Sequence, residues 1–525
     1  MQFWYFCTEQ NTVYVWSVMA CLIKTASVFI KGLYATLEVM KASDTATTAS
    51  SEEFLYQQLA DRLEMQIRQN VLKTGDKLLS VRALSKEQGI SMSTAFNAYG
   101  QLEIKGLIEA RPKSGYYVRF TPRQYPVPVP SPDVKAVDSS HIASVDEMIA
   151  MIYKNMTAEG IVRFSQATPG LELLPHAKLN KAMIQAIRES PHCCMNYEDI
   201  QGNLRLRQQI ARYAFNSGCN VTGQDIVTTQ GCMEALVFCL RAVTSPGDAV
   251  AVESPAYFGI FKVMQSLGLK VVEIPGAPVT GISVDCLKEI IKKTDIKACL
   301  FVTNFNNPSG SCMPDEKKKQ LVDLLAKHEI PLIEDDIYGE LYFGKNRPRT
   351  CKSYDKKGLV LLCASVSKSL TPGYRVGWCI PGRFKEKIIS LKLTYTVSSA
   401  TPTQMAVGLF FETGRYDLHL RHLRKALHTQ CLRYLQAITA YFPEDTRVSN
   451  PQGGYVLWIA LNPGINAFEL FKQAIAENIS IAPGQIFSTD ARFSNYIRIG
   501  FGQPFDKKID KSLKVLGGLV KKMIG

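Results

Sequence analysis

The chain has 525 residues, too many for one hydrophobic core, so two or three domains are expected. A hydrophobic content of 46% and a charged content of 21% describe an ordinary soluble globular protein and exclude a wholly disordered or fibrous chain. The formal net charge of +14 favours a polyanionic partner.

The 14 cysteines are scattered, without a CxxC pair or a spacing typical of zinc ligands, so no metal site is expected. Several of them, such as Cys239, Cys299 and Cys363, lie inside apolar runs. We interpret them as buried, reduced thiols of a cytoplasmic protein.

Residues 1–49 form an atypical N-terminal extension. From residue 12 to residue 37 the segment is apolar and aromatic, interrupted by Lys24 and Lys31. It lacks the charged start and cleavage site of a signal peptide, and the two lysines interrupt any charge-free span long enough to cross a membrane. A transmembrane helix stays an alternative, but we favour a mis-assigned start, with translation beginning at Met40 and no membrane association.

Residues 50–120 contain three predicted helices followed by a β-hairpin. Apolar residues at helical spacing predict a first helix that ends near Gly75, and a second helix follows Ser80 and stops at Gly89. Ser91 is a favourable N-cap for the third helix. Two short helices joined by a tight, glycine-containing turn are typical of a helix-turn-helix motif. The following sequence, LIEARPKSGYYV, predicts a two-stranded wing.

The segment GDKLLSVRALSKEQGISMSTAFNAYGQLEIKGLIEARPKSGYYV resembles the winged helix of the GntR family of bacterial regulators. The resemblance implies binding to an operator in double-stranded DNA. It implies a phosphate contact by Arg82, major-groove contacts by Ser91, Ser93 and Thr94, and minor-groove contacts by Lys113 and Gly115. The chain departs from the family pattern at Leu79, where proline is usual, and at the apolar Met92 and Phe96. The alternative is a helical accessory domain with a solvated basic face.

Residues 121–141 form a proline-rich linker. Five prolines fall between residues 122 and 132. Such a segment favours the polyproline II conformation and spans about 3 Å per residue, roughly 34 Å in all. It predicts a semi-rigid spacer between the first domain and a large domain at residues 142–525.

From residue 161 onward, apolar strands and helices alternate along the chain. The predicted strands contain the sequences DIVTTQ, DAVAVESP, KVVEIP, KACLFVTN, IPLIEDD and LVLLCAS. This order predicts an α/β fold with a mainly parallel sheet covered by helices on both faces, divided into a large part at 161–382 and a smaller α/β part at 383–525. In such sheets a ligand binds beyond the carboxyl ends of the strands, where the conspicuous polar residues of this chain occur.

Lys368 follows the last of these apolar strands, in the stretch LVLLCASVSKSLTPGYRVGW. Partial burial makes a lysine amine nucleophilic, as Schiff-base formation with pyridoxal 5′-phosphate (PLP) requires. Gly231 and Cys232 open a helix whose N-terminus suits a phosphate. Asp335 and Asp336 end another strand and are costly to bury unless they meet a cation, for example a protonated pyridine nitrogen.

The order of these features resembles the class I and II aminotransferases of fold type I, from residue 161 to the end of the chain. The resemblance implies that Lys368 is the catalytic residue that forms the Schiff base and that Asp335 pairs with the ring nitrogen. It implies that Asn307 and Tyr338 bind the ring oxygen and that Tyr257 stacks on the ring. The residues implied to hold the phosphate are Gly231, Cys232, Ser365, Ser367 and Arg375. It also implies that Tyr197 reaches the phosphate of a partner subunit, that Arg498 pairs with a substrate or effector carboxylate, and that Gly170 belongs to the substrate-binding loop.

Each of these residues also has a purely structural interpretation. Tyr257 could be a half-buried core aromatic, Arg498 part of an ion pair at a strand edge, and Asn307 a turn former before proline. The histidines, including His419 and His422, are interpreted as surface residues.

A winged helix, a proline-rich linker and an aminotransferase-like domain together resemble the MocR/GabR-type regulators. The resemblance implies a cytoplasmic transcription regulator that binds PLP, senses PLP, an amino acid or another amine, and forms a head-to-tail homodimer. The alternative is a PLP-dependent aminotransferase with an accessory DNA-binding domain. A DNA-binding protein with an inactive second domain is disfavoured because Lys368, Asp335 and Arg375 are all present. The effector, the operator sequence and the sign of regulation stay open.

Overall fold

The computed structural model describes residues 55–67, 71–72, 76–104, 106–111, 114–118, 139–156 and 159–524. The chain divides into two units, residues 1–121 and residues 122–525. The predicted N-terminal extension and most of the predicted linker lie outside the described residues. The last three residues assigned to the linker already belong to a helix, α4 (Ser139–Met156).

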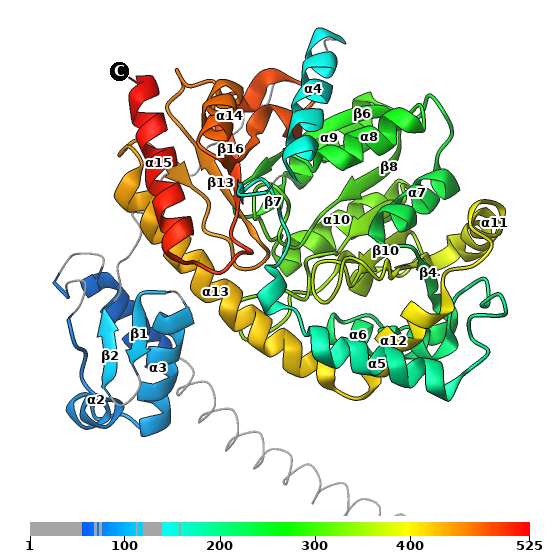
Figure 1. The fold of residues 1–525 in the computed structure, drawn as a ribbon. Helices are drawn as coiled ribbons and strands as arrows, with labels where there is room; N and C mark the ends of the chain where they lie inside the picture. Colours follow the sequence, from blue (N-terminus) through cyan, green and yellow to red (C-terminus); the bar gives the residue numbers. More distant parts are fainter. Residues whose placement is uncertain are drawn as a thin grey trace, which may run out of the picture. The chain divides into compact units, whose positions relative to one another are not determined.

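The first unit contains the predicted helix-turn-helix (Figure 1). α2 (Val81–Gln88) begins after Ser80, whose side chain accepts a hydrogen bond from the Ala83 amide, and ends at Gly89 in the left-handed conformation, with φ of 63°. In α3 (Met92–Ile104) the Thr94 amide donates to Ser91 Oγ at 3.0 Å, which confirms the predicted N-cap.

The first helix of this unit is shorter than predicted. Residues 55–67 are helical, but Val71 and Leu72 form a bend, so the helix does not extend to Gly75. The hairpin consists of β1 (Ile108–Arg111) and β2 (Gly115–Val118), paired antiparallel. The core that joins helices and hairpin includes Leu59, Leu84, Ala95, Tyr99, Leu102, Ile108 and Val118.

The second unit is built on an eight-stranded sheet in the order β4-β11-β10-β9-β8-β5-β6-β7. The strands are β4 (Val227–Thr229), β5 (Ala249–Ser254), β6 (Lys270–Ala277), β7 (Gly281–Ile282), β8 (Ile296–Phe301), β9 (Leu332–Asp335), β10 (Val360–Ser365) and β11 (Gly377–Ile380). The pairs β10–β9, β9–β8, β8–β5 and β5–β6 are parallel, which confirms the predicted mainly parallel sheet. β11 was not predicted as a strand, and it runs antiparallel between β10 and β4.

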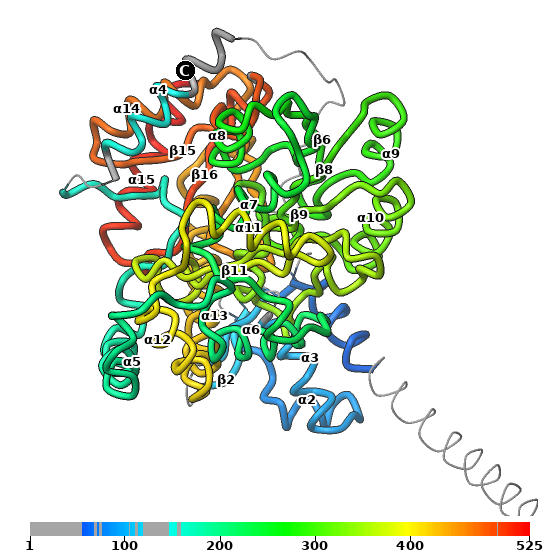
Figure 2. Tube along the Cα trace, turned by 90° about the vertical axis from the view of Figure 1, so that its right-hand side faces the viewer, coloured from blue at the N-terminus to red at the C-terminus, as the bar shows by residue number. Residues whose placement is uncertain are grey.

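Alternating strand residues face two helical layers, because successive side chains of a strand point to opposite faces. On one face, Val252, Leu300 and Cys363 pack against α7 (Cys232–Val243), α8 (Phe258–Ser266) and α11 (Lys385–Tyr395). The other face packs against α9 (Val284–Lys293), α10 (Asp315–Lys327), α5 (His176–Glu189), α6 (Leu204–Asn216) and α12 (Thr401–Glu412). Figure 2 shows α9 and α10 beside each other. The helical layers of the large sheet therefore continue beyond residue 382.

The smaller C-terminal part has its own four-stranded sheet, in the order β12-β13-β16-β15. It comprises β12 (Arg447–Val448), β13 (Val456–Ala460), β15 (Ala482–Pro483) and β16 (Tyr496–Gly500), covered by α14 (Ala467–Ala476) and α15 (Lys507–Ile524). Beside this sheet, β3 (Val162–Arg163) pairs in parallel with β14 (Ile479–Ser480). Residues 162–163 are therefore held against the smaller part.

The long helix α13 (Arg415–Tyr441) links the large sheet to the smaller part and corrects one prediction. His419, which was expected on the surface, is buried at 7% exposure, and its Nε2 lies 2.7 Å from the carbonyl oxygen of Ser369. The prediction was wrong for His419 because α13 packs that side against the large sheet, whereas His422, on another side of the helix, is exposed. Of the helices that the structure describes, none combines the length and apolarity that a membrane span requires.

Candidate functional site

A cavity of about 270 Å³ opens at the carboxyl ends of the parallel strands. It collects residues from widely separated parts of the second unit: the N-terminus of α7, the start of α8, the loop after β8, the end of β9, the turn after β10, β16 and α4. Its lining includes the predicted Cys232, Tyr257, Asn307, Asp335, Tyr338, Ser367, Lys368, Arg375 and Arg498. The predicted ligand position, beyond the strand ends, is therefore where this cavity lies.

Lys368 reaches the cavity from a tightly held turn. Its Nζ donates to the carbonyl oxygen of Ala167 at 2.8 Å. Tyr455 donates to the carbonyl oxygen of Lys368, while Tyr416 bonds the hydroxyl of the next residue, Ser369, at 2.6 Å. Burial, with a smaller contribution from the charge of Arg498, lowers the pKa of Lys368 to about 8. About a tenth of its amine is therefore uncharged and nucleophilic at pH 7, far more than for an ordinary exposed lysine.

The two adjacent aspartates at the end of β9 have different surroundings. Asp335 lines the cavity, and its Oδ1 accepts hydrogen bonds from the Cys232 thiol at 3.3 Å and from the Ile337 amide at 3.1 Å. Burial raises the pKa of Asp335 to about 6, so it is mostly ionised at neutral pH. Asp336 instead forms an ion pair with Arg347 outside the cavity.

Asn307, Tyr338 and Tyr257 lie along one side of the cavity. The Asn307 amide nitrogen donates to the Tyr338 hydroxyl at 3.4 Å. Burial raises the pKa of Tyr338 well above its usual range and that of Tyr257 to about 12, so both phenols keep their protons and can donate. These three side chains present hydrogen-bond donors and an aromatic face to a planar ligand.

Arg375 and the start of α7 form the end of the cavity suited to an anion. Arg375 Nη2 donates to the carbonyl oxygen of Gln230 at 3.0 Å, and its Nη1 lies 3.4 Å from Ser367 Oγ. Gly231 has φ of 92°, and a Cβ there would come within 2.3 Å of Arg375 Nη2, so glycine makes room for the guanidinium. Ser365 does not line the cavity, but its Oγ accepts the Ser367 amide at 3.2 Å and supports that residue.

Arg498 is buried at 3% exposure in the middle of β16. It donates to Asn307 Oδ1 at 3.1 Å and to the carbonyl oxygen of Ser165, while its buried Nε has no partner among the described residues. Burial lowers its pKa to about 10, which leaves the guanidinium charged at neutral pH. A buried cation with a spare donor is typical of a site that receives a carboxylate.

Besides Gly231 and Ser365, two further predicted residues do not line the cavity. Tyr197 is 86% exposed in the loop between α5 and α6. Gly170 donates its amide to the Gly502 carbonyl at 2.8 Å, and a Cβ there would meet Pro504 at 2.8 Å. Gly170 therefore holds the segment that ends in Ala167 and Thr168 close to the smaller part.

Sequence reasoning missed several residues that line the cavity. The carbonyl groups of Ser165 and Ala167 bind Arg498 and Lys368. A main-chain carbonyl has no sequence signature, so no motif could have identified them. The side chains of Ile152 and Tyr153 were also missed, although the apolar spacing in DEMIAMIYKNM predicts one buried face of a helix.

The predicted DNA contacts lie on the first unit. Arg82 on α2 and Ser91 and Ser93 at the start of α3 are exposed, whereas Thr94 is buried at 5% and its hydroxyl lies 2.7 Å from Ser91 Oγ. Thr94 therefore orders the start of α3 instead of presenting its side chain outward. Gly115 begins β2 with φ of 108°, and Lys113 lies outside the described residues.

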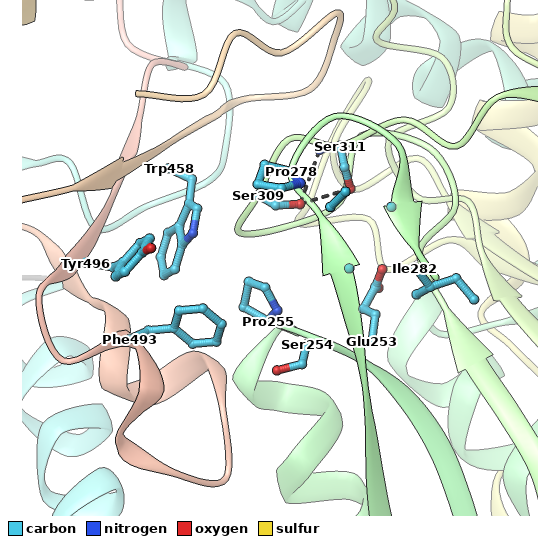
Figure 3. A pocket seen from close by; sticks show the side chains of 13 residues that line it. Glu253, Ser254, Pro255, Pro278, Ile282, Ser309, Ser311, Trp458, Phe493 and Tyr496 are labelled. Carbon is cyan, nitrogen blue, oxygen red and sulfur yellow. Dashed lines mark hydrogen bonds between the residues drawn. The ribbon is translucent and has the colours of Figure 1, made fainter. Parts of the chain in front are cut away.

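A second, smaller cavity of about 30 Å³ lies between the large sheet and the smaller part (Figure 3). Trp458, Phe493 and Tyr496 face Pro255 across it, and Glu253 lies beyond Pro255, beside Ile282. Burial raises the pKa of Glu253 to about 8. The space suffices for about two water molecules, so this cavity is a small gap where the two parts meet and not a cofactor site.

The residues of the larger cavity fit PLP. An uncharged lysine amine suits an aldehyde, a buried carboxylate suits a pyridine nitrogen, and two donors suit the ring oxygen. The arginine, the serine and the bare helix N-terminus suit a phosphate. The Cβ clash at Gly231 supports this fit, since the arginine occupies space that any other residue would fill.

Comparisons with known proteins agree with this geometry. Residues 165–516 match the model of the family "Aminotransferase class I and II", and residues 55–118 match "Bacterial regulatory proteins, gntR family". The chain belongs to the MocR/GabR-type regulators of the GntR family. The HTH-type transcriptional regulators YjiR and YdcR of Escherichia coli (strain K12) are 38% and 36% identical to this chain. Each alignment covers 89% of the chain, with 98% and 99% of the respective relative.

Solved structures resemble the second unit. An archaeal alanine:glyoxylate aminotransferase superposes with a TM-score of 0.68 at 24% identity, covering 74% of this family member and 96% of that chain. The α-aminoadipate aminotransferase LysN of Thermus thermophilus, solved with N-(5′-phosphopyridoxyl)-L-leucine, gives 0.67 at 24% identity, covering 74% and 98%. At identities this low, the likeness establishes the fold alone, and the second unit has the fold of a fold-type I aminotransferase domain.

Proposed function

We propose that this chain is a DNA-binding transcription regulator that acts in the cytoplasm and uses PLP to sense an amino compound. The observation that carries the proposal is Lys368, an amine with a pKa of about 8 that faces the same cavity as Asp335, Arg375 and Arg498. The same chain carries a GntR-type winged helix. A cofactor site fused to a DNA-binding domain is suited to control DNA binding by the occupancy of that site.

Each residue of the cavity has a defined part in holding the cofactor. PLP, when bound, supplies an aldehyde carbon that can exchange one amine for another. Lys368 provides the resident amine, Asp335 keeps a proton on the ring nitrogen, and Arg375 with Ser367 binds the phosphate. Asn307 and Tyr338 donate to the ring oxygen, and Tyr257 covers the ring.

An incoming amino compound competes with Lys368 for the cofactor, while Arg498 binds its carboxylate. Once released, Lys368 Nζ can again donate to the Ala167 carbonyl, as it does in this structure, and that carbonyl lies on the chain that connects α4 to the large sheet. The backbone of the lysine turn is bonded to Tyr455 and His419, from the smaller part and from α13. Occupancy of the site therefore acts on contacts between the parts of the second unit. Such a ligand shifts a conformational equilibrium only by as much as it binds the two states differently.

The proposal includes a head-to-tail homodimer on a two-part operator. Large apolar side chains are exposed on and after α5 and at the end of α11: Ile184, Ile187, Met195, Tyr197, Leu393 and Tyr395. Several large apolar side chains left exposed on one chain are typical of surfaces that a partner covers. Burial of Tyr197 in the dimer would bring it to the phosphate of the partner subunit. Two copies of the winged helix match two half-sites, which is the usual geometry of such regulators.

A second candidate function is transamination. The observation in its favour is that Lys368, with a pKa of about 8, is suited to accept and return a proton near neutral pH. Single-turnover mixing of the PLP-loaded protein with amino acids distinguishes the two functions. Formation of a keto acid at a rate useful for metabolism would favour the enzyme, and its absence would favour the sensor.

The cofactor assignment can be tested with a matched pair of lysine variants. Lys368→Met should lose the visible absorbance that PLP acquires on a lysine. Lys392→Met is the control, because Lys392 is also buried in the second unit, with a pKa lowered to about 8, but lies outside the cavity. An unchanged spectrum in Lys368→Met would contradict the assignment.

The regulatory part needs a separate measurement. The intact protein should protect a segment of DNA upstream of its own gene from nuclease, and the protection should change when PLP is added. No protected segment under either condition would contradict the proposed regulation without affecting the cofactor assignment.

A further inference from the structure

The cavity that contains Lys368 has one wall that carries no charge. Ile152 and Tyr153 of α4 and Phe258 of α8 form this wall. The charged side chains that line the cavity are Asp335, Lys368, Arg375 and Arg498. In the proposed function these four are used by the ring nitrogen, the aldehyde, the phosphate and the effector carboxylate. Among the described lining residues, no charged group is left for the remainder of the effector.

The wall is held in place by contacts to both parts of the second unit. Met148, Ile149 and Ile152 are buried on one face of α4 at 5%, 8% and 5% exposure. An ion pair between Asp146 and Lys262 joins α4 to α8. The structure therefore presents Ile152 from a packed helix and not from an exposed loop.

Aromatic contacts continue this wall toward the smaller part. The Tyr153 ring lies edge-on to Phe258 at 6.3 Å, and Phe258 contacts Phe487 at 6.4 Å. Tyr153 itself is 51% exposed, so its ring forms the outer rim of the cavity. A group that enters beside Ile152, Tyr153 and Phe258 meets aliphatic and aromatic side chains on this wall.

The chemistry of this wall selects among amino acids. A carboxylate or ammonium group placed there would lose part of its hydration without gaining a group of opposite charge, which is unfavourable. An apolar group gains from the same desolvation, roughly fourfold in affinity for each methylene that is buried. Leucine and aspartate have side chains of nearly the same shape, so charge is the main difference between them.

We propose that Ile152 and Tyr153 form the subsite for the effector side chain and that the effector is an α-amino acid with an uncharged, apolar side chain. This inference rests on the proposed function, because it takes Lys368 as the cofactor site and Arg498 as the carboxylate partner. The helix that carries the subsite begins at Ser139, within the last three residues of the segment predicted as the linker. The effector side chain thus touches the element through which the chain continues to the winged helix.

The test is a calorimetric titration of the PLP-loaded full chain with L-leucine and L-aspartate, followed in parallel by visible absorbance. Leucine should bind at least tenfold more tightly than aspartate. Tyr153→Arg places a cation at the exposed rim and should reduce this ratio at least tenfold. Ala150→Arg is the control, since Ala150 is exposed on the same helix and does not line the cavity. It should leave the ratio unchanged.

The outcomes separate this inference from the function on which it rests. Equal or tighter binding of aspartate to the unaltered protein would overturn the inference while a Lys368-dependent absorbance band still supports the cofactor. A ratio that Tyr153→Arg leaves unchanged would also overturn it. A protein that shows no such band would overturn the proposed function and this inference together.

Discussion

The two ends of the large cavity are built in opposite ways. At the cofactor end, charged and polar side chains come from the ends of separate strands. Hydrogen bonds hold them in place, as for Arg375 with Ser367 and the Gln230 carbonyl. At the effector end, Arg498 is followed by a wall of apolar side chains from α4 and α8. The cofactor end suits a ligand that stays bound, and the effector end suits a ligand that binds and dissociates.

This difference has an energetic consequence. Charge-assisted bonds at the cofactor end are each worth about 1.5–3 kcal/mol, and a buried charge left without its partner costs about 3–5 kcal/mol. Contacts at the effector wall contribute about 0.8 kcal/mol per methylene. Substitutions at the cofactor end should therefore have the larger effects, and the order of the following predictions tests that.

The largest effect is expected for Asp335→Asn. Loss of the carboxylate leaves a protonated ring nitrogen without its buried partner, which costs about 3–5 kcal/mol, or more than 100-fold in PLP affinity. Equilibrium dialysis against PLP measures it. Asp336→Asn is the matched control, since Asp336 pairs with Arg347 outside the cavity and should affect stability instead. Similar PLP affinities for the two variants would show that the cofactor end is not organised around Asp335.

Arg498→Gln should come next and should affect only the other end. Removal of the charge-assisted pair with the effector carboxylate costs about 1.5–3 kcal/mol, roughly 10- to 150-fold in effector affinity. The visible absorbance of bound PLP should be retained. Calorimetry with L-leucine measures the loss. An unchanged effector affinity would show that Arg498 does not bind the effector carboxylate.

The two ends should also differ in their dependence on pH. The rate at which PLP is captured follows the uncharged fraction of Lys368, so it should rise nearly tenfold per pH unit below about pH 7, more slowly toward the pKa of about 8, and level off above it. Arg498, with a pKa of about 10, stays charged over the same range. The contribution of Arg498 to binding of the effector carboxylate should therefore be nearly constant. Stopped-flow absorbance measures the capture rate, and a rate already level at pH 6.5 would contradict the lowered pKa of Lys368.

The smallest effect is expected for Ile152→Val. One methylene less at the wall should weaken leucine binding roughly two- to fourfold and cost about 0.5–1.5 kcal/mol of stability. Ile149→Val is the control, because Ile149 is buried on the same helix but does not line the cavity. It should lower the free energy of unfolding similarly, as measured in urea, without affecting leucine binding. Equal losses of leucine affinity in both variants would mean that α4 acts through stability alone.

Much of the cofactor end was predictable because its residues belong to local motifs. Lys368 after an apolar strand, Asp335 at a strand end and Gly231 before a helix each have a recognisable sequence context. The order of strands and helices then predicts that they meet at one edge of a parallel sheet. The winged helix was predictable for a similar reason, since Ser80, Gly89 and Ser91 are short-range capping residues.

The remainder depends on contacts between residues far apart in the sequence. Lys368 and Ala167 are separated by 201 residues, and the bond uses a main-chain carbonyl that any residue could supply. His419 was predicted on the surface because its own helix is rich in basic residues, and only the packing of α13 against the large sheet buries it. The different surroundings of Asp335 and Asp336 arise in the same way, from Cys232 on one side and Arg347 on the other.

The sequence by itself therefore determined the family, the two units and the residues suited to PLP, because those depend on local patterns and on their order. Only the tertiary structure decided that the Lys368 amine is held by the Ala167 carbonyl, that the Arg498 guanidinium keeps a spare buried donor, and that α4 forms the wall of the cavity. The physical reason is that burial, and with it the lowered pKa of Lys368, is a property of the packed chain and not of any segment.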